Sequence, residues 1–293
     1  MTIFSLFKET STDENREKKE IIHKEINQII DEKSKAKESN VKEISKETYK
    51  NTIEHVTDEF GDIMPETQRV RIDIERKNHL PIVLAPEVYA KRFPEADPAV
   101  LGHYDAEGRV FLKEGSPETV THVTTHEALH LTSYKEVDDF NPELKVYQSG
   151  IRETTYKENR LEEDKNRALN EGITEMYAMR EMMQRGDISS IEAVTAYPEA
   201  QRKAYELQEI VGSDVIQKAY FGGDLELLKS EVNRLSFGDE TAWNRYSENV
   251  DVLEYGTDEN EIRHARIKLT VQNAIMTSFR ESEAHDKPNQ DNV

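Results

Sequence analysis

The sequence contains no cysteine, which excludes disulfides, cysteine-ligated zinc, iron–sulfur clusters and a thiol nucleophile. Any transition-metal site must therefore use histidine, aspartate or glutamate. Long apolar runs are also missing. The run at residues 3–7 is too short for a signal-peptide core, and no stretch is long enough to span a bilayer. We expect an intracellular, cytoplasmic protein, with export by a route that needs no classical signal as the alternative.

Basic residues are scarce relative to acidic ones. The 293 residues include 39 Lys and Arg against 59 Asp and Glu, for a formal charge of −20. Such a chain repels phosphate backbones and anionic membrane surfaces, so nucleic acid is not an expected partner. Residues 1–58 hold 11 basic and 13 acidic residues, and the remaining 28 basic and 46 acidic residues carry −18. The acidity therefore belongs to the body of the chain.

Residues 1–58 also lack proline and glycine, and isoleucines between residues 21 and 30 follow helical spacing. This pattern predicts a charged helical arm. One interpretation is a solvated, partly disordered helix, and the other is a coiled-coil or docking helix for a protein partner. We place a catalytic domain at 59–186, a helical subdomain at 187–285, and a flexible tail at 286–293.

The pattern between residues 59 and 186 predicts both strands and helices. Residues 81–86 read as a buried strand, and residues 103–104 and 109–112 as a hairpin with a glycine in its turn. A helix from Ser116 to about Tyr134 begins with a serine cap and a proline. A second helix is expected from Arg167 to Arg185, closed by a glycine.

The first of these helices carries His126-Glu127-Ala128-Leu129-His130, an HExxH motif. Histidines at i and i+4 project from one helical face, so both imidazoles can reach one tetrahedral Zn²⁺. Glu127 points about 100° away around the helix and would reach the attacking water. The motif therefore predicts two zinc ligands and a general base.

The second helix supplies a third ligand in Asn170-Glu171-Gly172-Ile173-Thr174-Glu175. Glu171 can complete a site of two histidines and one glutamate with an open fourth position. Glu175 lies one turn further on the same face, where it can accept the free N–H of a ligating histidine. One zinc ion per chain is the expected cofactor.

HExxH followed by this NExxTE pattern resembles the gluzincin metallopeptidases, including thermolysin-like enzymes and the catalytic cores of aminopeptidase N-type enzymes. The resemblance covers about residues 80–185. It makes His126, His130 and Glu171 the zinc ligands, Glu127 the general base and Glu175 the outer partner. It also implies an α+β fold with a zincin-like catalytic domain, in which a small mixed sheet accompanies the two ligand helices.

The resemblance further implies that the edge strand before the HExxH helix holds extended substrate, and residues 109–112 stand where that strand is expected. The 40 residues between His130 and Glu171 exceed the family's usual gap and indicate an insertion, which we assign to a strand-like stretch at 146–155 and a charged stretch at 156–165. No exopeptidase motif precedes the zinc motif.

A tetrahedral oxyanion needs one more hydrogen-bond donor, and the family recruits a Tyr or His from beyond the second ligand helix. His264, Tyr220 and Tyr246 are the candidates, each with a purely structural role as the alternative. His122 lies one turn before His126 and either lines the cleft or is an ordinary helix-face histidine, since three imidazoles at this spacing cannot reach one ion.

These observations predict a zinc metallopeptidase that hydrolyses peptide bonds as an endopeptidase acting on one or few proteins. The alternative is an inactive or structural-zinc helical interaction or scaffold protein. The net acidity favours neutral or basic substrates through electrostatic steering.

Overall fold

The computed structural model describes residues 39–94, 100–104, 109–141, 144–158, 160–187, 189–190 and 197–286. Residues 1–38 of the predicted arm and 287–293 of the predicted tail lie outside them. The fold is mixed α+β, as expected, with helices dominating the described chain. No helix in these ranges is both long enough and apolar enough to cross a membrane.

The N-terminal part consists of a helix over residues 39–60 followed by α2 (Glu66–Asn78). Tyr49, Ile53 and Phe60 on the first helix are at most 4% exposed and belong to the main core. The last third of the predicted arm, residues 39–58, is therefore packed against the body. Its apolar face follows the helical period, which is why it can bury one side while its Lys and Glu residues face solvent.

A three-stranded mixed sheet follows, made of β1 (Ile82–Leu84), β2 (Gly102–Tyr104) and β3 (Val110–Lys113), with α3 (Pro86–Arg92) after β1. The strand order is β1-β3-β2, with β1 parallel and β2 antiparallel to β3. The hairpin of β2 and β3 is confirmed. Residues 109–112 were expected to form an edge strand, and this prediction is wrong. β3 is the central strand, because β1 pairs with one side of it and β2 with the other.

The strand expected at 81–86 is also more exposed than predicted. Only residues 82–84 are extended, and Ile82 is 40% exposed because β1 lies at the edge of the sheet. β2 forms the opposite edge.

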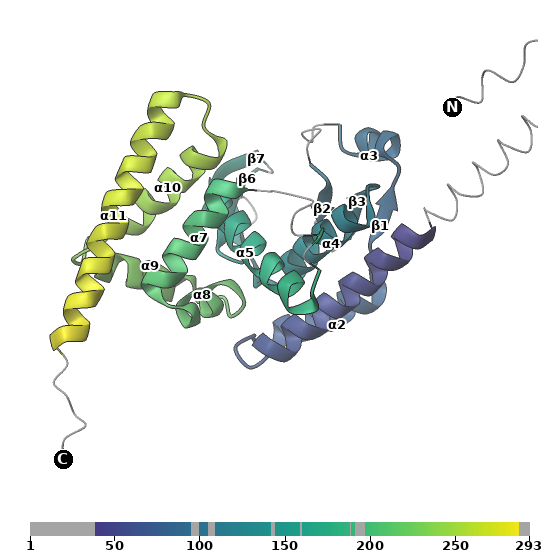
Figure 1. Ribbon diagram of the computed structural model, residues 1–293, viewed down its shortest axis with the longest axis horizontal. Helices are drawn as coiled ribbons and strands as arrows, with labels where there is room; N and C mark the ends of the chain where they lie inside the picture. The colour runs from purple at the N-terminus through teal and green to yellow at the C-terminus, as the bar shows by residue number, and fades with distance from the viewer. Residues whose placement is uncertain are drawn as a thin grey trace, which may run out of the picture.

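The two helices predicted to carry the zinc ligands are α4 (Pro117–Thr132) and α5 (Arg167–Arg185), and Figure 1 shows them at the centre of the molecule. The Ser116 hydroxyl accepts the Thr119 N–H at the start of α4, as its sequence predicts. Gly186 ends α5 with φ of 77°, a left-handed conformation that glycine adopts without steric cost. Both predicted helices are thus confirmed, α4 ending two residues early.

The carboxyl end of α4 is held by polar side chains from α2. Gln68 Nε2 donates to the Thr132 carbonyl at 3.0 Å, and Arg71 Nη2 donates to the Leu131 carbonyl at 2.7 Å. These carbonyls have no partner within the helix, and a guanidinium complements the negative end of the helix dipole. α2 therefore fixes the position of the HExxH helix from outside.

The insertion between the ligand helices is an antiparallel four-stranded meander of β4 (Lys135–Asn141), β5 (Leu144–Ser149), β6 (Arg152–Lys157) and β7 (Arg160–Lys165). Asn170 of α5 anchors it, because its Oδ1 accepts the Ile151 N–H at 3.1 Å in the β5–β6 turn. The adjacent Gly150 has φ of 60° and leaves no room for a Cβ beside Asn170. The asparagine of the NE motif is therefore a fold anchor.

The C-terminal part is helical, as predicted. It comprises α7 (Pro198–Val211), α8 (Ser213–Tyr220), α9 (Leu225–Leu235), α10 (Ala242–Tyr255) and α11 (Glu259–Asp286), which lie together on the left of Figure 1. One hydrophobic core includes Ile53, Leu129, Ile173 and Trp243, and so it crosses both proposed boundaries, at residues 58 and 186.

Candidate metal centre

The structure brings His126, His130 and Glu171 together with their ligand atoms converging on one point. His130 Nε2 lies 3.1 Å from His126 Nε2 and 3.1 Å from Glu171 Oε2, and the third side of the triangle is 3.3 Å. A tetrahedral zinc ion with bonds of about 2.0–2.1 Å separates its ligand atoms by roughly 3.3–3.4 Å. The three side chains therefore fit a zinc ion with little rearrangement.

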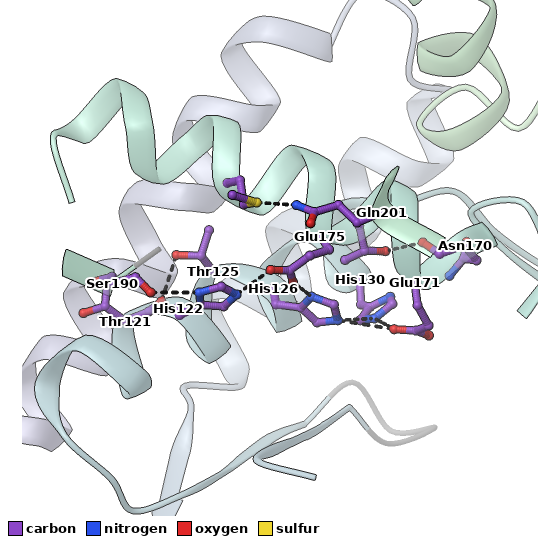
Figure 2. A network of polar contacts seen from close by, with 12 residues as sticks. Thr121, His122, Thr125, His126, His130, Asn170, Glu171, Glu175, Ser190 and Gln201 are labelled. Atoms are coloured by element: carbon purple, nitrogen blue, oxygen red, sulfur yellow. Dashed lines mark hydrogen bonds and ion pairs between the residues drawn. The ribbon is translucent and has the colours of Figure 1, made fainter. Parts of the chain in front are cut away.

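The carboxylate of Glu175 lies on the other side of the His126 ring. Its Oε2 is 2.9 Å from His126 Nδ1, which donates its hydrogen when Nε2 is the ligand atom. Glu175 therefore lies beside His126, where its i+4 spacing from Glu171 predicts it. Figure 2 shows the network continuing from Glu175 to His122 and Ser190.

His122 does not line the cleft. The residue is 1% exposed, and its Nε2 lies 2.6 Å from Glu175 Oε1. It is also more than an ordinary helix-face histidine, because it extends the polar chain behind the ligands. The helical spacing placed it on the correct face, but only the packing of α4 on α5 shows its partner.

The charges of this cluster depend strongly on burial. Burial opposes ionisation of Glu171, but the nearby charge of His130 and hydrogen bonds from both histidines hold the pKa of Glu171 well below its ordinary value. Burial likewise opposes ionisation of Glu175, whose hydrogen bonds to His122 and His126 lower its pKa to about 2. Both groups are therefore carboxylates at neutral pH, as a metal ligand and its outer partner must be.

Glu127 is 6% exposed, and no hydrogen-bond partner of its carboxylate is found among the described residues. Burial raises its pKa, although the charges of His130 and His126 oppose the shift. A buried carboxylate with a raised pKa beside a cation site is suited to taking and returning a proton. The structure thus places Glu127 where general-base chemistry is feasible.

Strand β2 passes directly against Glu127. A Cβ on Gly102 would overlap Glu127 Oε1 and Val123 Cγ1, so only glycine allows this approach. The edge strand beside the candidate site is therefore β2, not the 109–112 strand expected from the sequence.

None of the three predicted oxyanion donors joins the triad by a hydrogen bond within the described chain. The Tyr220 hydroxyl is buried and lies 2.7 Å from Thr174 Oγ1, while the Tyr246 hydroxyl donates to the Lys203 carbonyl at 3.3 Å. His264 is exposed on α11. Tyr220 and Tyr246 therefore fit a structural role better than a role as oxyanion donor, because their hydroxyls make local hydrogen bonds in the helical part.

Another tyrosine, Tyr197, lies beside the triad. Its ring is nearly parallel to that of His126, with centroids 6.0 Å apart. Burial raises the pKa of Tyr197, and the charges of Glu171 and Glu127 raise it further. The phenol therefore stays protonated at neutral pH.

Close packing of α7 on α5 positions Tyr197. A Cβ on Gly172 would collide with the Ala200 backbone, so the glycine after the ligand Glu171 lets the start of α7 approach α5. Tyr197 precedes Pro198 and has φ of 51°, a conformation that costs a non-glycine residue about 1–3 kcal/mol. Two features of the sequence could have pointed to Tyr197. Gly172 lies inside the predicted helix that becomes α5, and the Tyr197-Pro198 pair stands at the start of the next helix, α7.

A second group of metal-compatible side chains, His55, Glu59 and Glu181, links the helix at 39–60 to α5. His55 Nδ1 already pairs with Glu181 Oε2 at 2.7 Å, and Glu59 pairs with Arg180. These groups satisfy one another, and we assign no ion to them.

Comparisons of the chain with protein-family models, with curated proteins and with solved structures gave no match. Functional assignment therefore depends on the chemistry of the site itself.

Proposed function

We propose that this chain is a zinc-dependent metallopeptidase of the gluzincin type, with a zincin-like catalytic region and one zinc ion per chain. We further propose that it is an endopeptidase acting on a restricted set of proteins. The observation that carries the proposal is the triangle of His126, His130 and Glu171 beside a buried carboxylate without a hydrogen-bond partner in the described chain.

His126, His130 and Glu171 would hold the zinc ion, which would supply Lewis-acid chemistry by lowering the pKa of a water and polarising a carbonyl. Glu127 then accepts the proton of the attacking water and delivers it to the leaving amine. Its raised pKa suits both halves of that transfer, because a group that takes a proton must also release it.

Tyr197 is the donor that we assign to the developing oxyanion. Its ring lies against that of His126, and its raised pKa keeps the hydrogen in place for donation. The stacking on His126 limits the movement of the ring, so little reorganisation accompanies the reaction.

Strand β2 offers a surface for extended substrate. It pairs with β3 on one side, and no strand pairs with its other side within the described residues. A peptide added to that edge gains backbone hydrogen bonds and runs past Gly102 toward Glu127.

The experiment is Glu127→Gln, assayed with a mixed peptide library in which new termini are detected by mass spectrometry. The substitution preserves shape and removes the base, so we expect unchanged zinc content and a loss of turnover of about 10²–10⁴-fold. Glu118→Gln on the same helix is the matched control, because that carboxylate lies in the first turn of α4, away from the triad.

Equal cleavage by Glu127→Gln and wild type would refute the mechanism. If zinc-loaded wild type cleaves no peptide, the alternative of a zinc-containing interaction or scaffold protein is favoured. Loss of zinc from His126→Ala, measured by mass spectrometry, tests the metal site separately from activity.

A further inference from the structure

His122 is a buried titratable side chain near the triad that the proposed reaction does not use. It lies one helical turn before His126 on α4 and is 1% exposed. Both of its ring nitrogens have partners: Nε2 lies 2.6 Å from Glu175 Oε1, and Nδ1 lies 2.9 Å from the Ser190 carbonyl oxygen. A buried imidazole with two short contacts has a fixed orientation.

The chemistry of these partners determines where hydrogens lie. The Ser190 carbonyl can only accept, so His122 Nδ1 donates to it. Glu175 Oε1 lies 2.6 Å from His122 Nε2, within hydrogen-bond distance, so this contact holds one carboxylate oxygen while His126 Nδ1 contacts the other.

The two oxygens of Glu175 are consequently committed to different histidines. Oε1 faces His122 and Oε2 faces His126 Nδ1 at 2.9 Å. Rotation of the carboxylate would break both contacts at once. Figure 2 shows this chain running from Ser190 through His122 and Glu175 to His126.

We propose that His122 is a positioning residue for the metal, acting through Glu175 to keep the Nε2 lone pair of His126 aimed at the ligand triangle. The inference rests on the proposed zinc site but not on peptidase activity. Glu175 of α5 thus lies between His126 and His122, which are both on α4.

Two substitutions separate this role from simple packing. In His122→Gln the amide nitrogen replaces Nε2 and retains a donor to Glu175. In His122→Asn the amide nitrogen replaces Nδ1 and retains only the donor to Ser190. Both variants remain polar and neither enlarges the side chain, so they form a matched pair.

Zinc affinity is measured by competition with a chelator, and the visible spectrum of the Co²⁺-substituted protein reports the ligand geometry. We expect His122→Gln to bind zinc within about threefold of wild type. His122→Asn should bind about 10- to 100-fold more weakly, the usual effect of losing an outer partner. The Co²⁺ spectrum should change in the Asn variant alone.

Equal zinc affinity of the Asn variant and wild type would overturn the proposal, as would equal losses in both variants. A further arm uses the Glu175→Gln background, in which His122→Asn should cost no additional affinity if it acts through Glu175. An additional loss there would also overturn it.

Failure of this inference is distinguishable from failure of the proposed function. The zinc-affinity pattern can hold in a protein that cleaves no peptide, and Glu127→Gln can abolish turnover in a protein whose His122 variants bind zinc normally.

Discussion

Zinc binding should release a proton from His126, and this prediction follows from its surroundings. Burial lowers the pKa of His126, but the hydrogen bonds and charges of Glu171 and Glu175 outweigh burial and raise that pKa to about 10. At pH 7 the metal-free protein then holds His126 in its protonated form. A ligand must offer a lone pair, so this proton must leave when zinc binds.

The magnitude follows directly. One proton is released per zinc ion at pH 7, and the apparent association constant rises about tenfold per pH unit below the pKa of His126. Between pH 6 and pH 8 the zinc affinity should therefore increase about 100-fold. Titration calorimetry in two buffers of different ionisation heat counts the protons, and chelator competition at several pH values gives the slope.

Glu175→Gln is the informative control for this measurement. The substitution removes one of the two carboxylates that hold the His126 proton, so proton release should fall and the pH slope should flatten. Absence of proton release in wild type, with zinc affinity independent of pH from 6 to 8, would refute the reasoning and show that His126 is neutral before zinc binds.

Four further predictions concern stability, the third ligand, the oxyanion donor and the α5–α7 contact. The raised pKa of His126 stabilises the metal-free protein below pH 6.5 and is lost as pH rises toward 10. The lowered pKa of Glu175 stabilises it above pH 4.5 and is lost as pH falls toward 2. These two groups therefore favour a maximum in the denaturation midpoint of metal-free protein between pH 4.5 and 6.5, and a steady rise from pH 6.5 to 9 would contradict the assignment. Glu171→Ala should weaken zinc binding more than about 100-fold in chelator competition, since a ligand matters more than an outer partner. Tyr197→Phe should lower kcat about 10²–10³-fold with KM and zinc content unchanged, and an unaltered kcat would remove Tyr197 from the mechanism. Gly172→Ala should destabilise the protein by about 1–3 kcal/mol in urea denaturation, because its methyl group meets the α7 backbone.

Local patterns were sufficient to predict the elements that carry the ligands. The Ser116-Pro117 start of α4 and the glycine that ends α5 are short-range signals, and the structure confirms both. The i, i+4 spacing placed His126 and His130 on one face, and the same spacing placed Glu175 beyond Glu171. Such residues share a helix, so the geometry between them is a property of the helix itself.

The identity of the edge strand could not be obtained in this way. Residues 110–113 form a mostly buried strand that precedes the HExxH helix in sequence, but β1 pairs with them in parallel from 29 positions earlier in the chain. Once β1 occupies that side, β2 becomes the edge and Gly102 comes to Glu127. Pairing between distant strands is a tertiary choice that a hairpin signal does not contain.

The tyrosine beside the triad escapes prediction from sequence for a related reason. Residue type and position after α5 favour Tyr220 and Tyr246 as donors, but a buried tyrosine in a helical bundle usually serves local hydrogen bonds, as both do. Tyr197 reaches the triad because Gly172 removes the side chain that would hold α7 away. A glycine costs a helix interior about 1 kcal/mol relative to alanine, so its presence beside a metal ligand is itself a sign of close approach. The residue that meets the ligand face at that approach is therefore the stronger candidate for catalysis.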